Sequence, residues 1–404
     1  MSVVHAPHIY LPKEGVDMTK YAVVACDQFT SQKEYWDELK EDIGNSVSTF
    51  HMIYPEAYLE STNQEEYINN INININRYLS NGDLLDKGES FVLVERVTSY
   101  GVRRLGLIIS IDLEEYSYLR GVPCSIKASE ATIVERIPPR LKIRKDAPIE
   151  LPHTLLLFDD KDKTIVEPIY KDRDKLECRY DFDLNQNGGH IRGYLIKDTQ
   201  NVIRLFDSLY KKNNNGLMFI VGDGNHSLAT AKAHWENVKQ TLSEEERKTH
   251  PARFALVEAN NIYDEGIIFE PIHRIIFNAD KELLAGLKGL CSNGAKTTYA
   301  YSKELGKVEF KVPGNAAETY QIIQKYIDEY LQNHKESKVD FIHDESSLID
   351  VANKNSGSLA ILMPALGKSD IFEFVALDKV LPRKSFSMGH ASEKRYYLEA
   401  KKIA

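Results

Sequence analysis

Short apolar runs of four or five residues recur along the chain, and segments of helical character lie between most of them. Runs of this length are typical of buried strands. They cover residues 21–25, 90–94, 105–109, 155–158, 218–221 and 254–257. Helices are expected over residues 32–43, 191–211, 227–241 and 318–332. The alternation predicts an α/β or α+β fold in which helices flank a sheet.

Two segments refine this prediction. Residues 90–111 hold two apolar runs with no helix between them, which predicts a hairpin or meander and therefore a mixed sheet. Residues 68–76 alternate Ile and Asn, as a strand of period two does. Asn is a poor strand residue, however, and Asn81-Gly82 is typical of the end of a helix. A helix is therefore favoured over residues 68–76.

Length and charge limit the domain count and the class of partner. The 404 residues suffice for about two to three domains. We expect an N-terminal α/β lobe over 1–125, a motif-bearing core over 126–300 and a C-terminal lobe over 301–404. With 51 basic and 60 acidic residues the net charge is −9, which makes nucleic acid an unfavourable partner.

Cysteines and apolar segments give expectations about metals and location. The four cysteines lie far apart in the chain, so they form no closely spaced pair of zinc ligands. Residues 1–11 lack a signal-peptide pattern, and no apolar stretch approaches the roughly 18 residues of a membrane span. We expect a cytoplasmic protein with reduced thiols and no membrane partner. The sequence leaves the oligomeric state open.

The most informative motif is Gly222-Asp223-Gly224-Asn225-His226-Ser227, which joins an apolar run to an alanine-rich helix. Glycines let the backbone turn sharply and approach a ligand, and the free N–H groups of a helix start suit a phosphate. Asp223 suits Mg²⁺ or the proton of a hydroxyl nucleophile, and His226 suits a phosphoryl oxygen. The alternative is structural: Asp223 or Ser227 caps the helix, and His226 satisfies a backbone carbonyl.

A basic cluster over residues 127–145 is the second candidate. Guanidinium groups bind phosphate in two places at once, so Arg136 and Arg140 are better candidates than the lysines. Glu130 lies among these cations and is expected to be ionised, as a base or a metal ligand. A solvated, salt-bridged turn is the alternative. Lys384, in a basic segment near the carboxyl end, is a further candidate for phosphate, and Asp27 follows the first strand, where it either lines a pocket or caps the next helix.

Five strings of sequence carry a resemblance to a known family. They are residues 25–32, 129–140, 221–233, 269–274 and 381–400, the last including Glu393-Lys394-Arg395-Tyr396-Tyr397-Leu398-Glu399. On these strings the chain resembles the domain-of-unknown-function 1015 (DUF1015) family over essentially its whole length. That family has no assigned activity. Members are often encoded beside serine-biosynthesis enzymes, which makes serine or phosphoserine a candidate substrate.

The motif around Asp223 is in turn similar to the Asp-Gly-His-His-Arg type of motif of the ParB, sulfiredoxin and free-serine-kinase superfamily. The resemblance implies a ParB/sulfiredoxin-like core with extra lobes, in which the motif holds nucleotide phosphates. Asp223 matches the aspartate, Gly224 the glycine, Asn225 the first histidine and His226 the second. Ser227 replaces the arginine, which puts one phosphate contact in doubt. Glu130 is assigned as the upstream glutamate only from its order in the chain.

Three functions follow as hypotheses. The first is a phosphotransferase that uses ATP or ADP with Mg²⁺ and acts on a small hydroxylated metabolite, with serine as a candidate. In it, Asp223, His226 and Glu130 carry the reaction, Asp223 also holds the metal, and the 222–227 segment with Arg136, Arg140 and Lys384 binds the nucleotide. The second is a phosphatase for a phosphorylated amino acid. The third is a ParB-like nucleotide-binding regulator without turnover.

Overall fold

The computed structural model describes residues 2–59, 63–119, 121–377 and 379–404. The chain forms two compact units. Unit 1 comprises Met1–Ala128, Thr132–Ile267 and His390–Ala404, and unit 2 comprises Ser129–Ala131 and Ile268–Gly389. The domain borders expected after residues 125 and 300 thus fall within unit 1 and unit 2, respectively.

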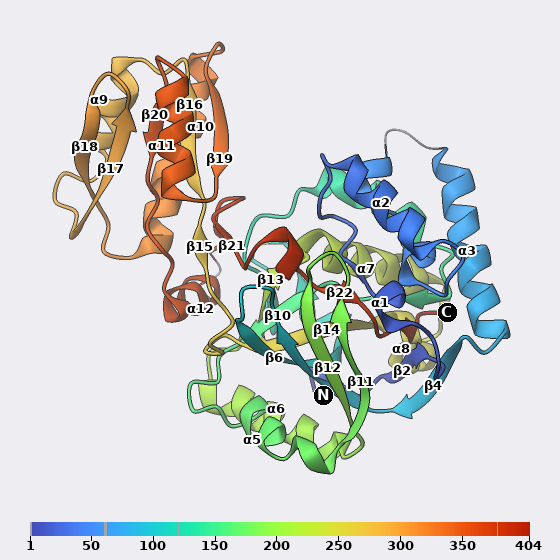
Figure 1. Cartoon of the computed structure of the whole chain (residues 1–404). Helices are drawn as coiled ribbons and strands as arrows, with labels where there is room; N and C mark the ends of the chain where they lie inside the picture. Colours follow the sequence, from blue (N-terminus) through green and yellow to red (C-terminus); the bar gives the residue numbers. More distant parts are fainter. Residues whose placement is uncertain (1, 60–62, 120, 378) are drawn as a thin grey trace. The chain divides into compact units, whose positions relative to one another are not determined.

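Unit 1 is built on a ten-stranded mixed sheet with the order β11-β12-β5-β6-β14-β10-β13-β8-β7, and β1 pairs with β6 (Figure 1). The strands are β1 (Val4–His5), β5 (Phe91–Val97), β6 (Arg103–Asp112), β7 (Tyr116–Ser117), β8 (Ile126–Ala128), β10 (Leu155–Phe158), β11 (Glu177–Leu184), β12 (Gly189–Ile196), β13 (Phe219–Asp223) and β14 (Phe254–Asn261). β10 runs parallel to β14 and antiparallel to β13. The predicted mixed sheet is confirmed, and so is the predicted hairpin, because β5 and β6 pair directly as antiparallel neighbours.

Both faces of this sheet are buried, because successive side chains of a strand point to opposite faces. Phe91 and Leu93 belong to one apolar core, together with residues of α6 (Thr199–Asn213) and α7 (Asn225–Val238). Val92 and Val94 belong to the other core, together with residues of α2 (Lys33–Ile43) and α3 (Gln64–Ser80). Helices therefore cover each face, as the apolar pattern predicts.

Most expected helices form. α2 and α7 lie where they are predicted, and residues 68–76 belong to α3, in which Ile71 and Ile75, four residues apart, are buried together. The helix expected over 191–211 is wrong in its first part. Residues 191–196 belong to β12, which pairs with β5 and β11, and α6 begins only after Asp198, whose side chain accepts the N–H of Asn201. Pairing with two strands outweighs the local helical pattern there.

The carboxyl-terminal segment threads through unit 1 in short strand pairs. β22 (Tyr396–Tyr397) pairs with β3 (Val23–Val24), and β23 (Lys401–Lys402) pairs with β9 (Ile149–Glu150). The remaining elements of unit 1 include β2 (His8–Pro12), β4 (Leu84–Glu89), α1 (Met18–Tyr21), α4 (Ile137–Arg144), α5 (Val166–Lys171) and α8 (Glu244–Thr249). Residues more than 370 positions apart in the sequence therefore pair at β3.

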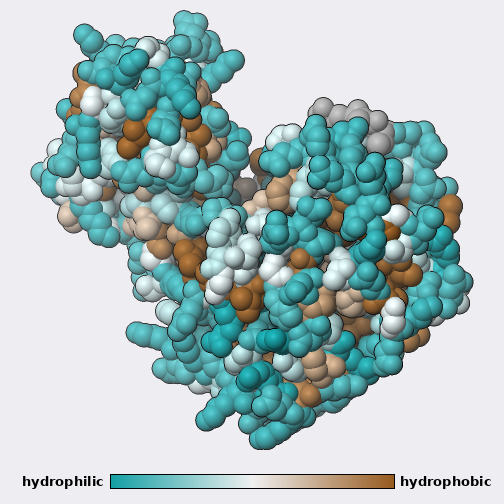
Figure 2. All heavy atoms as spheres, viewed as in Figure 1, coloured by the Kyte–Doolittle hydropathy of each residue, from teal (hydrophilic) through white to brown (hydrophobic). Residues whose placement is uncertain are grey.

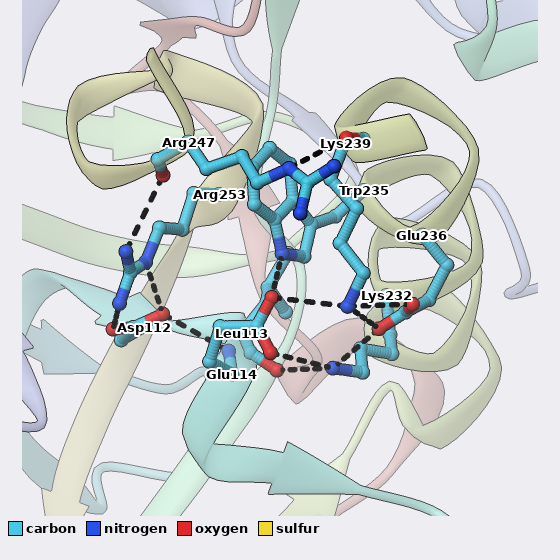
Figure 3. A network of polar contacts seen from close by, with 9 residues as sticks. All are labelled: Asp112, Leu113, Glu114, Lys232, Trp235, Glu236, Lys239, Arg247 and Arg253. Atoms are coloured by element: carbon cyan, nitrogen blue, oxygen red, sulfur yellow. Dashed lines mark hydrogen bonds and ion pairs between the residues drawn. The ribbon is translucent and has the colours of Figure 1, made fainter. Parts of the chain in front are cut away.

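A polar network, drawn in Figure 3, links α7 to the end of β6. Trp235 donates its indole N–H to Glu114 at 2.6 Å, and Lys232 donates to the carbonyl of Leu113 at 2.9 Å. Asp112 and Arg253 form a buried ion pair with Nη2–Oδ2 at 2.6 Å. These contacts fix the helix whose first turn carries the 222–227 motif.

Unit 2 contains a five-stranded antiparallel sheet with the order β18-β17-β20-β16-β19. Its elements are β15 (Glu270–Pro271), β16 (His273–Phe277), α9 (Lys281–Gly289), β17 (Lys296–Ser302), β18 (Gly306–Val312), α10 (Ala316–Asn333), β19 (Lys338–Ile342), α11 (Glu345–Lys354), β20 (Leu359–Ile361), α12 (Lys368–Ala376) and β21 (Phe386–Ser387). α10 matches the helix expected over 318–332.

The surface drawn in Figure 2 is mostly hydrophilic, with apolar atoms in scattered groups. Among the helices of the described ranges, none combines the length and the apolar character that a membrane crossing requires.

Candidate functional site

The 222–227 motif forms a sharp junction between β13 and α7. Asp223 ends β13, Gly224 has φ +80°, and α7 begins at Asn225. A Cβ on Gly224 would lie 2.9 Å from the Cα of Thr154, so this position excludes a side chain by backbone angle and by space. Gly222 lies within β13 and has no positive φ. Only the second glycine of the motif is therefore needed for the turn.

Replacing Gly224 by alanine is expected to lower the free energy of unfolding by about 2–3 kcal/mol, because alanine is strained in a left-handed backbone conformation and its Cβ would clash with Thr154. Gly15→Ala is the matched control, because Gly15 has φ +86° with no atom within 4 Å of the added Cβ. Gly15→Ala should lose only the free energy due to backbone strain, about 1 kcal/mol. Urea denaturation measures both. Equal losses of unfolding free energy in the two variants would show that the clash with Thr154 adds nothing to the cost of Gly224→Ala.

Asp223 is held as an anion. Its Oδ2 lies 3.0 Å from Nζ of Lys394, and its Oδ1 accepts the N–H of Gly224 at 2.9 Å. Burial opposes ionisation, but the charge and hydrogen bond of Lys394 outweigh it, so the pKa of Asp223 lies below its ordinary value. Lys394 follows the short helix η8 (Ala391–Glu393), far from Asp223 in sequence. The site therefore holds a carboxylate that is charged at neutral pH.

His226, in contrast, is neutral. Burial, with the nearby charges of Arg140 and Arg136, lowers its pKa to about 4. Its Nε2 accepts the backbone N–H of Ile133 at 3.2 Å, which places the ring proton on Nδ1. His226 thus offers a neutral N–H donor at the start of α7, a hydrogen-bonding role that does not depend on pH in the neutral range.

The two candidate arginines lie near His226. Arg136 ends the short helix η4 (Val134–Arg136), and Arg140 follows in α4. Arg140 pairs with Glu56 and donates to the carbonyl of Arg136 at 2.9 Å. Arg136 is exposed, and within the described residues no ion pair engages its guanidinium. Of the two, Arg136 has the charge that is more available to an anion.

A cavity of about 980 Å³, counted with its opening to solvent, lies in unit 1 beside the first turns of α7 and α4. Ser227 and Thr230 of α7 and Arg140 of α4 line it, together with His153 and Tyr397. The cavity therefore adjoins part of the predicted phosphate-binding segment.

Its polar end contains Cys26, His153 and Tyr397, none of which the sequence singled out as a site residue. Tyr397 donates its hydroxyl to Sγ of Cys26 at 3.1 Å and lies 2.8 Å from Nδ1 of His153. Nε2 of His153 lies 3.9 Å from a carboxylate oxygen of Asp27. Burial, with Asp27 next in effect, raises the pKa of Cys26 to about 12, so the thiol is neutral and a poor nucleophile.

Glu130 and Lys384 both belong to unit 2, apart from the other candidates in unit 1. The carboxylate of Glu130 accepts the backbone N–H groups of Ser385 at 3.0 Å and Lys384 at 3.3 Å. Burial raises the pKa of Glu130 to about 7 despite these bonds. Nζ of the exposed Lys384 side chain lies 5.0 Å from the ring centre of Phe341. Glu130 thus shapes the 382–386 turn, and its role in a reaction stays a prediction.

Metal-binding capacity differs between the two units. Within the described ranges, one set of three ligand atoms is close enough to share an ion: Asp280, Glu282 and His334 of unit 2. Asp223 is in no such set. Mg²⁺, however, is commonly held by one or two protein oxygens together with phosphates and water. Oδ1 of Asn225, two residues after Asp223 in the chain, is buried without a hydrogen-bond partner among the described residues, so both side chains are candidates for such a role.

Comparisons with known proteins place the chain in a family. A family model described as "Protein of unknown function (DUF1015)" matches residues 10–402. No curated protein matches.

Solved structures similar to this chain share little sequence with it. A conserved hypothetical protein from Pyrococcus furiosus is 12% identical, with 72% of this chain and 90% of that chain covered and a TM-score of 0.34. A free serine kinase in complex with AMP is 11% identical, with 73% and 92% covered and a TM-score of 0.38. SbnI with a C-terminal truncation, from Staphylococcus aureus, is 8% identical, with 72% and 82% covered and a TM-score of 0.37. The family model therefore decides the classification, and the chain belongs to the DUF1015 family.

Proposed function

We propose that this protein is a phosphotransferase that uses ATP or ADP with Mg²⁺ and acts on the hydroxyl of a small metabolite. The observation that carries the proposal is the ionised Asp223, paired with Lys394 at 3.0 Å, at the start of a helix whose first residues adjoin a cavity. A charged carboxylate beside a helix N-terminus and two arginines exceeds what capping α7 requires.

The first turn of α7 is suited to phosphate oxygens. The first helical bond of this turn joins the N–H of Leu228 to the carbonyl of Gly224, so the N–H groups of residues 225–227 precede it. His226 adds its Nδ1–H donor and Arg136 adds positive charge, whereas Arg140, which also lies nearby, pairs with Glu56. Such fixed donors and cations supply most of what phosphoryl transfer needs.

Asp223 would orient the acceptor hydroxyl and take up its proton. Lys394 keeps the carboxylate ionised and fixes its position. Asp223 and Asn225 would hold Mg²⁺, which neutralises phosphate charge when it is bound. His153 lines the polar end of the same cavity, with Asp27 3.9 Å from its Nε2, and is a further candidate for contact with the acceptor.

Ligand binding tests this proposal. ATP, ADP, CTP, serine, phosphoserine and inorganic phosphate, each with and without Mg²⁺, should be screened by thermal shift, because a ligand of the native state raises its stability by about 2.7 kcal/mol at a hundredfold excess over Kd. We expect a nucleotide to stabilise the protein and Arg136→Gln to weaken its binding about tenfold at unchanged Tm.

Two results would contradict the proposal. The first is the absence of stabilisation by every nucleotide and by inorganic phosphate. The second is release of phosphate from phosphoserine without any nucleotide, which would identify a phosphatase instead. Lys175→Gln is the matched control for Arg136→Gln, because it removes an exposed cation from another surface of unit 1.

A further inference from the structure

The cavity beside α7 has a predominantly apolar wall beyond its polar end. Many of the side chains that line it are aliphatic, among them Met52, Ile53, Leu59, Ile71, Ile143 and Ala147. They come from η1 (Thr49–Met52) and the segment after it, from one face of α3, and from α4 and the loop that follows it. Serine, a small zwitterion, would leave most of this wall uncovered.

The charged side chains of the wall neutralise one another. Arg140 pairs with Glu56, and Arg144 pairs with Glu150. Glu150 also accepts the N–H of Leu256 at 2.7 Å. In both pairs the carboxylate and the guanidinium are already engaged, so neither pair offers a free charge to a ligand in the cavity.

Two hydroxyl groups of the wall are engaged as well. Thr230 donates to the carbonyl of His226 at 2.7 Å, and Tyr397 donates to Cys26. Nε of Arg144 is buried without a partner and suits one acceptor atom. A ligand moiety rich in hydrogen-bonding groups would lose its bonds to water here and regain few, whereas a hydrocarbon moiety gains free energy on burial.

We propose that this cavity holds the hydrocarbon body, an aliphatic chain or an aromatic ring, of a metabolite whose phosphate or phosphate-accepting hydroxyl lies at the first turn of α7. The inference rests on the proposed function and names its substrate class. Ser227 lies on the phosphate-binding turn, and Thr230 lies one turn later in α7. Both side chains line the cavity, so the phosphate end and the hydrocarbon body of such a ligand can bind side by side.

Calorimetric titration of the full chain tests the inference with four sets of probes. Inorganic phosphate tests the anion site alone, 1-hexanol and benzyl alcohol test the cavity alone, and n-alkyl phosphates from methyl to hexyl test both together. AMP tests a nucleobase as the occupant. We expect affinity to rise about three- to fourfold with each methylene of the alkyl series.

A variant that fills the cavity gives the second measurement. Ala147 lines the cavity and is half-buried, so Ala147→Phe should weaken hexyl phosphate at least about tenfold and leave inorganic phosphate unchanged. Ala376→Phe, at a half-buried alanine of α12 in unit 2, is the matched control. If Ala147→Phe does not fold, the alkyl series on the unaltered protein decides.

The outcomes separate the two proposals. If inorganic phosphate binds but affinity does not change with alkyl length, the cavity inference is overturned and the proposed function stands. If Ala147→Phe weakens AMP as much as it weakens hexyl phosphate, a nucleobase occupies the cavity and the inference is again overturned. If the alcohols bind but no phosphate compound does, the proposed function fails, and with it the phosphate-bearing ligand.

Discussion

Replacing Asp223 by asparagine is expected to lower the rate of phosphoryl transfer at least about a hundredfold. Asparagine keeps the size of the side chain and can still accept the N–H of Gly224, but it removes the negative charge and the capacity to accept a proton. Because the pKa of Asp223 is depressed by Lys394, the wild-type carboxylate is fully charged across the neutral range. Steady-state kinetics with the nucleotide identified by thermal shift measures the loss.

The single variant also leaves Lys394, whose side chain is only 12% exposed, without its carboxylate. That orphaned cation is expected to lower the free energy of unfolding by about 1–3 kcal/mol. The double variant Asp223→Asn/Lys394→Gln removes both charges and should regain most of this stability. Its turnover should remain as low as that of the single variant.

Recovery of turnover in the double variant would mean that the ion pair matters only for folding. Wild-type turnover in the single variant would end the assignment of Asp223 to the reaction. Lys394→Arg completes the set, because it keeps the positive charge and should retain more activity than Lys394→Gln.

Local sequence signals predicted much of the fold. The short continuous apolar runs predicted the strands of the central sheet, because a strand with both faces buried needs apolar residues throughout. The burial of Ile71 and Ile75 on one face of α3 agrees with the helix favoured over 68–76. The error at 191–196 has a non-local cause: β12 is held by strands on both sides.

Only part of the candidate site could be predicted from the sequence. The turn at 222–227 carries a local signal, glycine beside aspartate at a strand end, and the structure places it beside a cavity. Lys394, His153 and Tyr397 carry no such signal, since each meets its partner across more than 150 residues. The string 393–399 belongs to the segments that resemble the family, but spacing alone does not assign its members to Asp223, Glu258 or Cys26.

That same string contains the buried ion network of unit 1. Arg395 pairs with both Glu258 and Glu399, and its Nε donates to the carbonyl of Pro152 at 3.0 Å. Tyr180 donates its hydroxyl to Glu399. Since Pro152 precedes His153 and Arg395 follows Lys394, the network fixes the backbone on both sides of the candidate site.

Replacing Arg395 by methionine is therefore expected to lower the free energy of unfolding by about 3–5 kcal/mol, because it leaves two buried carboxylates with one cation fewer. Denaturant titration measures this loss. Lys175→Met is the control, since the pair of Lys175 with Asp172 is exposed and its removal should change little. A loss no larger than that of the control would show that the buried network does not stabilise the fold.

The pH dependence of this loss distinguishes an uncompensated charge from a packing defect. In the wild type, burial opposes ionisation of Glu258, but Arg395 and Arg104 hold its pKa below the ordinary value. The stability that Glu258 contributes is therefore present above the pKa that its carboxyl has in the unfolded chain, and it is lost as the pH falls toward the lower pKa of the folded protein. In Arg395→Met the same carboxyl should have a raised pKa, so the variant should lose stability as pH rises through the unfolded value. The difference between the two proteins should thus be larger at pH 7 than at pH 5, whereas a cavity left by the guanidinium would give the same difference at both.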